Sequence, residues 1–390
     1  MKKKIIFVTR ALWIGGIETA LVNLINHMDP RKYDITCLIL QDEKPMAKRL
    51  PEYCRLLVAD RENTASFGER YRYPQLFHLT EEPDNPSRLH RAMMWLVPAI
   101  KWVENRLYIR YVRRQLKGER FDTCVIYSDV AAETAVRTVD AEKFLMFYHH
   151  GAMRRVYHDE VGYRRADKVI AVSDHQAEKL RAFCPGYAHK IVVVHNLVDT
   201  ERIRKKGSEP VQESFLPERF HIVSCGRVSR EKGMDLAVEA CAKLVAAGYK
   251  HIHWWIVGGG PAEADVREKI RHLGMENYVT MLGMKENPYP YIAAADLYVQ
   301  PSRFEGYPLS ILEALILGKP VVSTDNGGAG EILQSGITGI LCPISPEGIG
   351  EAIETLLSHP EDLERLRKNV ESRDQNAENR TAIRKFEEYL

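Results

Sequence analysis

The chain has 390 residues, of which 45% are hydrophobic, and its formal net charge is +2. A domain usually has roughly 100–200 residues, so this length predicts two hydrophobic cores with a cleft between them. The small net charge argues against a general attraction to polyanions such as nucleic acids. The seven cysteines are scattered without a Cys-x-x-Cys pair. They therefore indicate neither a disulfide framework nor a structural zinc site, and they favour a reducing cytoplasm.

The N-terminus begins with Met1 and three lysines, which are followed by an apolar run from Ile5 to Val8. This run is too short for the hydrophobic region of a signal peptide or for a transmembrane helix. We therefore expect a protein that is soluble or bound only peripherally to a membrane.

Short β-branched runs alternate with helical patterns through the first half of the chain. These runs are apolar on both faces, which is typical of strands in a parallel sheet covered by helices. Between the first two runs, apolar residues recur at helical spacing from Gly16 to Met28, which predicts the first strand-loop-helix-strand unit of a doubly wound fold. The predicted strands span residues 4–8, 34–40, 55–59, 122–127, 143–148, 168–172 and 190–194.

A polar segment from Asp199 to Arg219 interrupts this alternation and is typical of a linker between domains. A second alternation follows it. The predicted fold class is therefore α/β, with two Rossmann-like, doubly wound domains facing each other across a cleft. The strands predicted for the second domain span residues 220–225, 251–257, 278–282, 296–300, 320–323 and 339–342.

This pattern divides the chain into an N-terminal domain over residues 1–198, a linker over 199–219 and a C-terminal domain over 220–375. Residues 376–390 have an amphipathic helical pattern. Their place at the end of the chain would allow this helix to cross back to the N-terminal domain.

Two glutamates, Glu305 and Glu313, lie on either side of a predicted loop-to-helix junction. Pro308 suits the first position of the helix, where its missing N–H costs nothing. Near such a helix start, unpaired backbone N–H groups and the helix dipole favour a phosphate. Glu305 in the loop and Glu313 inside the helix could then accept hydrogen bonds from different hydroxyls of one elongated ligand. For an isolated pair of glutamates, simple solvation is the commoner explanation. The amides expected to face the ligand are those of Gly306, Tyr307, Leu309 and Ser310.

A second candidate cluster, from Gly226 to Gly233, follows a predicted strand and precedes a helix. This position places Arg227 and Lys232 at the carboxyl end of the sheet, where open α/β sheets bind ligands. Two cations beside helix amides could neutralise a diphosphate without a metal. For either residue alone, a role in surface solubility is an equal alternative.

Taken together, these segments resemble the retaining glycosyltransferases of family 4, which have the GT-B architecture and include bacterial enzymes of cell-surface polysaccharide and glycolipid synthesis. The resemblance covers roughly residues 4–345. It is specific when its parts are combined, although most of them are weak alone. These parts are Gly226-Arg227, Lys232-Gly233, Pro301-Ser302, Glu305, Glu313, Gly328 and Glu331.

In the C-terminal domain, the resemblance implies that Arg227 and Lys232 hold the diphosphate of a nucleotide sugar. It implies that Glu313 binds the ribose hydroxyls and that Glu305 contacts the transferred sugar. Gly306, Tyr307 and Leu309 complete the expected donor site.

In the N-terminal domain, Gly15 and Gly16 match the glycine-rich loop that closes on the donor phosphates in this family. Glycines permit such a close backbone approach, although a tight turn would also explain them. The resemblance also places a histidine that reaches the donor sugar at the end of the fifth strand. We prefer His150 to His149, because the family's histidine usually precedes a small residue. Since adjacent residues of a strand point to opposite faces, only one of them should enter the cleft.

The implied reaction moves a hexose-type sugar to a saccharide or lipid-linked acceptor with retention of the anomeric configuration. Uridine diphosphate is the commonest carrier in the family. No metal or other cofactor is expected, because the sequence has neither an Asp-x-Asp nor a His-Glu-x-x-His motif. Many members of the family have an aromatic or aliphatic residue and then glycine where this chain has Tyr307-Pro308. This departure removes one amide and leaves the donor identity open.

Residues 88–120 contain nine Lys/Arg and two Glu, interleaved with tryptophan and tyrosine. Such a basic aromatic segment could lie on an anionic membrane, here at the inner face of the cell membrane. An ordinary solvated helix whose aromatic residues pack inward is an equal alternative.

Other functions of the same architecture remain open at this point. A nicotinamide-dependent oxidoreductase is disfavoured, because the loop with Gly15 and Gly16 lacks the Gly-x-Gly-x-x-Gly spacing. A nucleotide-sugar epimerase would have the same fold, and the glutamate pair favours transfer over it. A binding module without catalysis is the third alternative.

Overall fold

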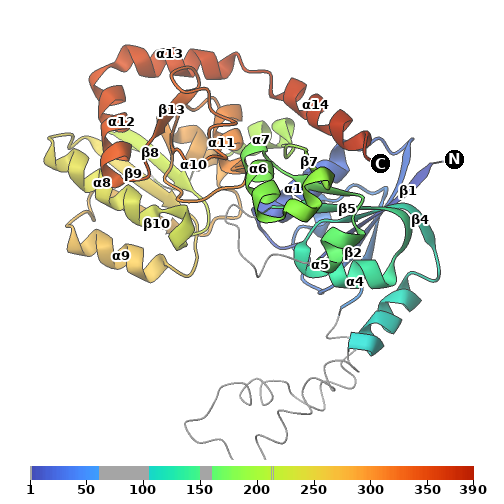
Figure 1. Ribbon diagram of the computed structural model, residues 1–390. Coiled ribbons are helices and arrows are strands. Elements are labelled where there is room, and N and C mark those ends of the chain that lie inside the picture. The colour runs from blue at the N-terminus through green and yellow to red at the C-terminus, as the bar shows by residue number, and fades with distance from the viewer. Residues whose placement is uncertain (1, 61–104, 150–159, 212, 214) are drawn as a thin grey trace, which may run out of the picture.

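The computed structural model describes residues 2–60, 105–149, 160–211, 213 and 215–390 (Figure 1). The first domain is built on a 7-stranded parallel sheet with the order β3-β2-β1-β4-β5-β6-β7. Its central strands are buried on both faces, the edge strand β3 is only partly buried, and the strands follow the apolar runs of the sequence. They are β1 (Lys3–Thr9), β2 (Tyr33–Ile39), β3 (Cys54–Val58), β4 (Arg120–Ile126), β5 (Asp140–Tyr148), β6 (Lys168–Ala171) and β7 (Ile191–Val193).

The helices of this domain form in the segments between strands. In α1 (Gly16–His27), the apolar side chains from Ala20 to Ile25 are buried against the sheet. The segment 105–115 is also helical. The other helical elements are η1 (Ala47–Arg49), η2 (Asp129–Ala131), α4 (Ala132–Thr138), α5 (Glu160–Arg165), α6 (Asp174–Phe183) and η4 (Pro185–Lys190).

The second domain has a 6-stranded parallel sheet with the order β10-β9-β8-β11-β12-β13. Its strands are β8 (Phe220–Cys225), β9 (Ile252–Val257), β10 (Val279–Gly283), β11 (Leu297–Gln300), β12 (Val321–Thr324) and β13 (Gly339–Cys342). Its helical elements are η5 (Arg230–Lys232), α8 (Met234–Ala246), α9 (Glu263–His272), α10 (Tyr289–Ala294), α11 (Leu309–Ile316), α12 (Pro346–Ser358) and α13 (Pro360–Glu371).

The fold class predicted from the sequence is confirmed, since both domains are doubly wound around parallel sheets. In each sheet the order reverses between two neighbouring strands, β1 and β4 in the first domain and β8 and β11 in the second. Loops on either side of such a reversal diverge and leave a crevice at the carboxyl ends of the strands. These two crevices are the places where a ligand site is expected.

The segment predicted as a linker is not irregular throughout. Its first part forms α7 (Thr200–Gly207), because the Asp199 side chain accepts a hydrogen bond from the Arg202 N–H at 2.9 Å and caps the helix. Ile203 is buried, and α7 packs against α10 and α11 of the second domain. The polar composition of this short helix concealed its helical pattern. Residues 208–219 then lead into β8.

The last helix, α14 (Gln375–Glu387), crosses back to the first domain (Figure 1). The ring of Phe386 lies 6.4 Å from that of Phe7 and 5.9 Å from that of Phe147, between centroids. The Nζ groups of Lys3 and Lys143 donate hydrogen bonds to the Leu390 carbonyl. The chain therefore connects its domains twice, through α7 and through the start of α14.

Within the described residues, no helix combines the length and the apolar character needed to cross a membrane. The basic aromatic segment 88–120 is described only from residue 105. In that part Tyr108 is buried, and its hydroxyl donates to the Ala59 carbonyl at 2.9 Å. Trp95 and Trp102 lie outside the described residues.

Candidate active site

The C-terminal crevice brings together two segments that the sequence singles out. Gly226 and Arg227 follow β8, and the loop from Pro301 to Gly306 follows its neighbour β11. Gly233 joins the two segments: its φ is +66°, and a Cβ there would lie 2.0 Å from the Pro301 carbonyl oxygen. Only glycine tolerates both the conformation and the approach. This packing holds η5, and with it Lys232, beside the loop that carries Glu305.

The Glu305 carboxylate is the centre of this crevice. It accepts hydrogen bonds from Lys232 Nζ at 2.7 and 2.8 Å, from Ser302 Oγ at 2.7 Å and from Gln300 Nε2 at 3.0 Å. The Gln300 amide oxygen accepts in turn from Tyr298 and Ser310. The Glu305 side chain is only 9% exposed. Its orientation is therefore fixed by the protein before any ligand binds.

The exposed face of this network is cationic. The Lys232 side chain keeps 26% of its surface exposed, so its ammonium group can meet a ligand as well as Glu305. Arg227 is exposed at the end of β8 and is not hydrogen-bonded to Glu305. The loop itself is anchored by Arg303, whose guanidinium forms two hydrogen bonds with Asp235 at 2.8 and 2.7 Å.

The junction between the loop and α11 differs by one residue from the prediction. Pro308 is not the first helical residue but the cap before it, with φ −72° and ψ 100°, and α11 begins at Leu309. No side chain of the described residues caps this helix. The N–H groups of its first turn therefore lack the partner that a capping side chain would supply. Such uncapped N–H groups are what an anion site at a helix start requires.

Glu313 lies in the second turn of α11, away from Glu305. Its carboxylate accepts a hydrogen bond from the Tyr289 hydroxyl at 3.0 Å. Burial raises the pKa of Glu313 to about 7, while the bond from Tyr289 and the charge of Arg49 act in the opposite direction. Arg49 belongs to η1 of the N-terminal domain, so Glu313 is influenced by both domains.

Gly15, Gly16 and His149 lie at the carboxyl end of the sheet of the N-terminal domain. Gly15 caps α1 and Gly16 is exposed in its first turn. The ring of His149 packs against those of Tyr127 and Phe147, with centroids 4.6 and 5.5 Å apart. His150, the preferred histidine, lies outside the described residues.

Glu18, in the first turn of α1, was not selected from the sequence as a site residue. Burial raises its pKa. Its charge in turn contributes to the raised pKa of Tyr127, so the two groups are close neighbours. Its place two residues after Gly16, in the first turn of the helix that the glycines open, was the signal that could have identified it.

The two domains touch beside the loop that carries Glu305. A Cβ on Gly306 would lie 2.9 Å from the His149 carbonyl oxygen and 2.9 Å from Gln176 Nε2. The Tyr307 ring stacks on His195 of the first domain, with centroids 5.1 Å apart and planes within 7°. Gly306 and Tyr307 therefore serve this contact between domains, a role that their position in the sequence did not indicate.

A carboxylate of the second domain strengthens the same contact. Glu331 accepts hydrogen bonds from the N–H groups of Asp174 and His175, at 2.7 and 2.5 Å, at the start of α6. Its oxygen also lies 3.5 Å from His195 Nε2. Burial alone would raise the pKa of Glu331, but His195 and the two N–H groups outweigh burial and hold the pKa below its ordinary value. The negative charge is therefore stabilised at the positive end of a helix dipole.

Asp174, His195 and Glu331 have ligand-type atoms within 4.8 Å of one another. This geometry alone would permit a metal ion. Both oxygens of Glu331, however, are already used by backbone N–H groups of α6. The contact between the domains therefore explains why these three side chains lie close together.

Two family models match the sequence. Residues 14–202 match the model described as Glycosyltransferase Family 4, and residues 206–373 match the model described as Glycosyl transferases group 1. Together they cover both domains. The chain therefore consists of a family 4 glycosyltransferase domain followed by a group 1 glycosyl transferase domain.

Curated relatives of this glycosyltransferase chain include biosynthetic enzymes of bacteria. The chain is 30% identical over 221 residues to alpha-D-kanosaminyltransferase of Streptomyces kanamyceticus, and the match covers 53% of this chain and 55% of the relative. It is 32% identical over 192 residues to the putative colanic acid biosynthesis glycosyltransferase WcaL of Salmonella typhimurium, covering 46% and 45%. The chain spans about half the length of the curated relatives it matches.

Solved structures resemble this glycosyltransferase over its whole length. Anabaena HepE, in complex with UDP and glucose, has a TM-score of 0.72 at 19% identity, covering 99% of this chain and 98% of that one. WaaG, a glycosyltransferase involved in lipopolysaccharide biosynthesis, has a TM-score of 0.65 at 15% identity, covering 97% and 98%. These likenesses show that the chain has the GT-B fold.

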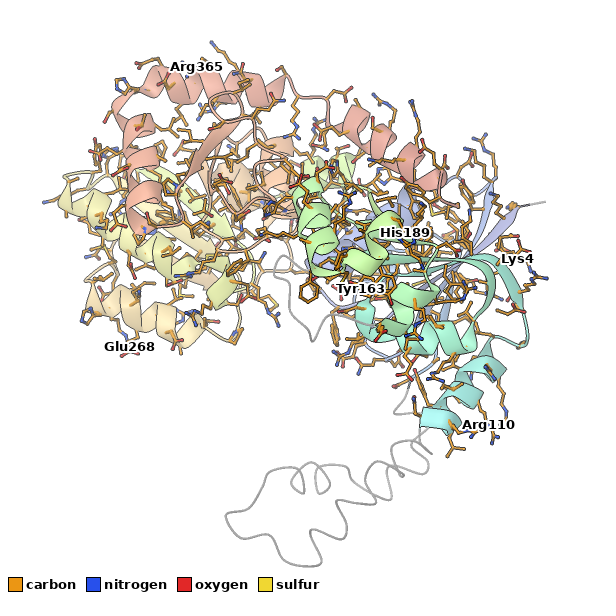
Figure 2. The ribbon with its side chains drawn as sticks, viewed as in Figure 1. Lys4, Arg110, Tyr163, His189, Glu268 and Arg365 are labelled. Atoms are coloured by element: carbon orange, nitrogen blue, oxygen red, sulfur yellow. The ribbon has the colours of Figure 1, made fainter. Side chains whose placement is uncertain are left out.

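We predict that Glu331→Gln loosens the contact between the domains. The amide keeps the shape of the side chain but removes the charge at the start of α6, which is worth on the order of 1 kcal/mol. We expect a larger radius of gyration by small-angle X-ray scattering and a lower Tm. The matched control is Glu268→Gln, because Glu268 lies exposed on α9 and points away from the domain (Figure 2). If both variants scatter like the wild type, Glu331 does not hold the domains together.

We predict that Glu313→Gln stabilises the protein at pH 8 and has little effect at pH 5. Since the pKa of Glu313 rises from 4.5 to about 7, the native state binds this proton more tightly than the unfolded chain, and stability falls as the pH rises between these values. The neutral amide avoids that loss, which is at most about 3 kcal/mol. The Tm of the variant and of the wild type at both pH values measures this change in stability, and Glu351→Gln is the control. An equal loss of Tm at both pH values would contradict this prediction.

Proposed function

We propose that this protein transfers a hexose-type sugar from a nucleotide-diphosphate sugar to a saccharide or lipid-linked acceptor, with retention of the anomeric configuration and without a metal. The observation that carries the proposal is the contact of Lys232 with Glu305 at the carboxyl ends of β8 and β11. A cation for phosphate and a carboxylate for hydroxyl groups lie side by side there, next to a helix start that no described side chain caps.

The donor then lies across the crevice. Its diphosphate meets Lys232, Arg227 and the first N–H groups of α11, its ribose meets Glu313, and its sugar meets Glu305 and His150. Gly15 and Gly16 approach the phosphates from the other domain. Uridine diphosphate is the proposed carrier, supported by the UDP complexes of the structurally similar HepE.

In the reaction, the bond between the anomeric carbon and the phosphate oxygen breaks, and its electron pair leaves with the diphosphate. The acceptor oxygen forms the new bond on the same face of the sugar, and its proton passes to a donor phosphate oxygen. Negative charge grows on the leaving group, so Lys232, Arg227 and the α11 dipole stabilise the transition state more than the ground state. Contact between the domains excludes water from this step.

Nucleotide binding tests this proposal most directly. We expect UDP to raise the Tm, because a ligand that binds only the native state stabilises it. Arg227→Gln should abolish the shift, while Arg271→Gln, which removes another exposed arginine, on α9, should not. Glu305→Gln should still bind UDP but lose sugar transfer. Stabilisation by NAD alone, or by no nucleoside diphosphate, would refute the proposed function.

We further propose that the acceptor is presented at an anionic membrane, against which residues 88–120 lie. In the described part of this segment, Arg110, Arg113 and Arg114 are exposed. We expect the protein to float with vesicles containing phosphatidylglycerol at low salt and to detach at high salt. If it does not float with these vesicles at low salt, this part of the proposal is wrong.

A further inference from the structure

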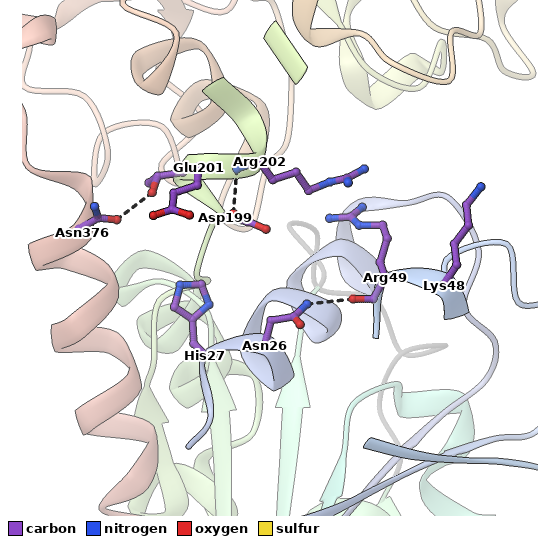
Figure 3. Close-up of a pocket in the computed structure, with 9 residues that line it drawn as sticks. Asn26, His27, Lys48, Arg49, Asp199, Glu201, Arg202 and Asn376 are labelled. Carbon is purple, nitrogen blue, oxygen red and sulfur yellow. Dashed lines mark hydrogen bonds between the residues drawn. The ribbon is translucent and has the colours of Figure 1, made fainter. Parts of the chain in front are cut away.

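A cavity of about 420 Å³ lies where the two domains are joined, away from Glu305. It is formed by the end of α1, by η1, by the first turn of α7 and by the start of α14 (Figure 3). Its described lining is entirely polar, which disfavours an apolar ligand. The lining residues are Asn26, His27, Lys48, Arg49, Asp199, Thr200, Glu201, Arg202 and Asn376.

Several of the neutral and acidic groups of this lining are already used within the protein. Asp199 caps α7, Thr200 donates to Asn376 at 2.8 Å, and Asn26 donates to the Arg49 carbonyl at 3.0 Å. These bonds hold the walls of the cavity in place. They leave Arg49, Arg202 and Lys48, which also pairs with Glu286, against the exposed carboxylate of Glu201.

Arg49 and Arg202 stand on opposite walls, and their guanidinium groups point toward one another (Figure 3). Among the described residues, Nε of Arg202 is shielded from solvent and has no hydrogen-bond partner. Burial, and then the charge of Arg202, lower the pKa of Arg49, and Tyr289, Glu313 and Asp199 offset this lowering only in part. Two like charges that face each other in a partly buried cavity are unfavourable unless acceptor oxygens lie between them.

We propose that this cavity binds an oxyanion, with a phosphate group held between Arg49 and Arg202. A guanidinium offers paired N–H groups that match two oxygens of one phosphate, and Lys48 adds a third positive charge at the rim. The cavity is larger than a phosphate alone requires, so it would accept a sugar phosphate. Arg227, Lys232 and Glu305 are not among its described lining residues, so this site is separate from the proposed donor site.

Such a ligand would contact both halves of the molecule. Arg49 comes from the N-terminal domain, whereas Arg202 lies on α7, which packs against α10 and α11 of the C-terminal domain. Binding would therefore hold the domains in the arrangement seen in the structure. The inference does not depend on the proposed sugar transfer, because none of the proposed donor ligands lines the cavity; the charge of Arg49 does act on Glu313.

Thermal unfolding with inorganic phosphate, glucose 6-phosphate or neutral glucose tests the site. We expect both phosphates, but not glucose, to raise the Tm of the wild type. In Arg49→Gln and Arg202→Gln, the apparent Kd for phosphate should rise at least about tenfold, since hydrogen bonds to a charged group are lost. Without ligand and at pH 5, where Glu313 is protonated, both variants should be as stable as the wild type or more stable, because each removes one of two facing like charges.

Two controls make the result specific. Lys205→Gln removes an exposed charge from the same helix, α7, outside the cavity, and should keep the response. Arg227→Gln should also keep it, whereas a response lost there would place phosphate in the donor site and overturn the proposal. The absence of any phosphate response in the wild type would overturn it as well. An equal response in every variant would show general salt stabilisation and would equally refute the site.

Discussion

The ion pair between Lys232 and Glu305 joins the two strand ends on which the candidate active site is built. Lys232 follows β8 and Glu305 follows β11, and these strands are neighbours although they are far apart along the chain. The close approach of Gly233 to the Pro301 carbonyl sets the distance between them. Because Glu305 also accepts bonds from Ser302 and Gln300, removing Lys232 would leave a largely buried carboxylate with only neutral donors. The pair is therefore part of both the fold and the site.

The sequence was sufficient to predict the strands of both sheets and much of this crevice. The strands could be predicted because parallel strands buried on both faces appear as uninterrupted apolar runs. Lys232 and Glu305 could be selected because each lies just beyond such a run, where the carboxyl edge of a sheet must be. The position of Pro308 was wrong by one residue, and α7 was missed because Ile203 is the only apolar side chain among its buried residues.

The contacts between domains could not be predicted from local patterns. Glu331 meets the start of α6 across 156 residues of sequence. Its partners there are backbone N–H groups, which carry no sequence signal. The stacking of Tyr307 on His195 also has no local sequence signal. Neither do the facing arginines, Arg49 and Arg202, of the cavity where the domains are joined. Such pairs depend on how two complete domains pack, which periodicity within one segment does not determine.

Two helices, α6 and α11, begin near this boundary between the domains, and the N–H groups at their starts differ in their hydrogen-bond partners. The start of α6 is satisfied by Ser173, which accepts from the Gln176 N–H, and by Glu331 from the other domain. The start of α11 follows Pro308, which has no side-chain acceptor, and no described side chain caps it. An anion that enters the cleft therefore finds donors at α11 and not at α6. The contact between the domains and the proposed donor site thus use separate helix dipoles, so the contact does not compete with a bound anion for the same N–H groups.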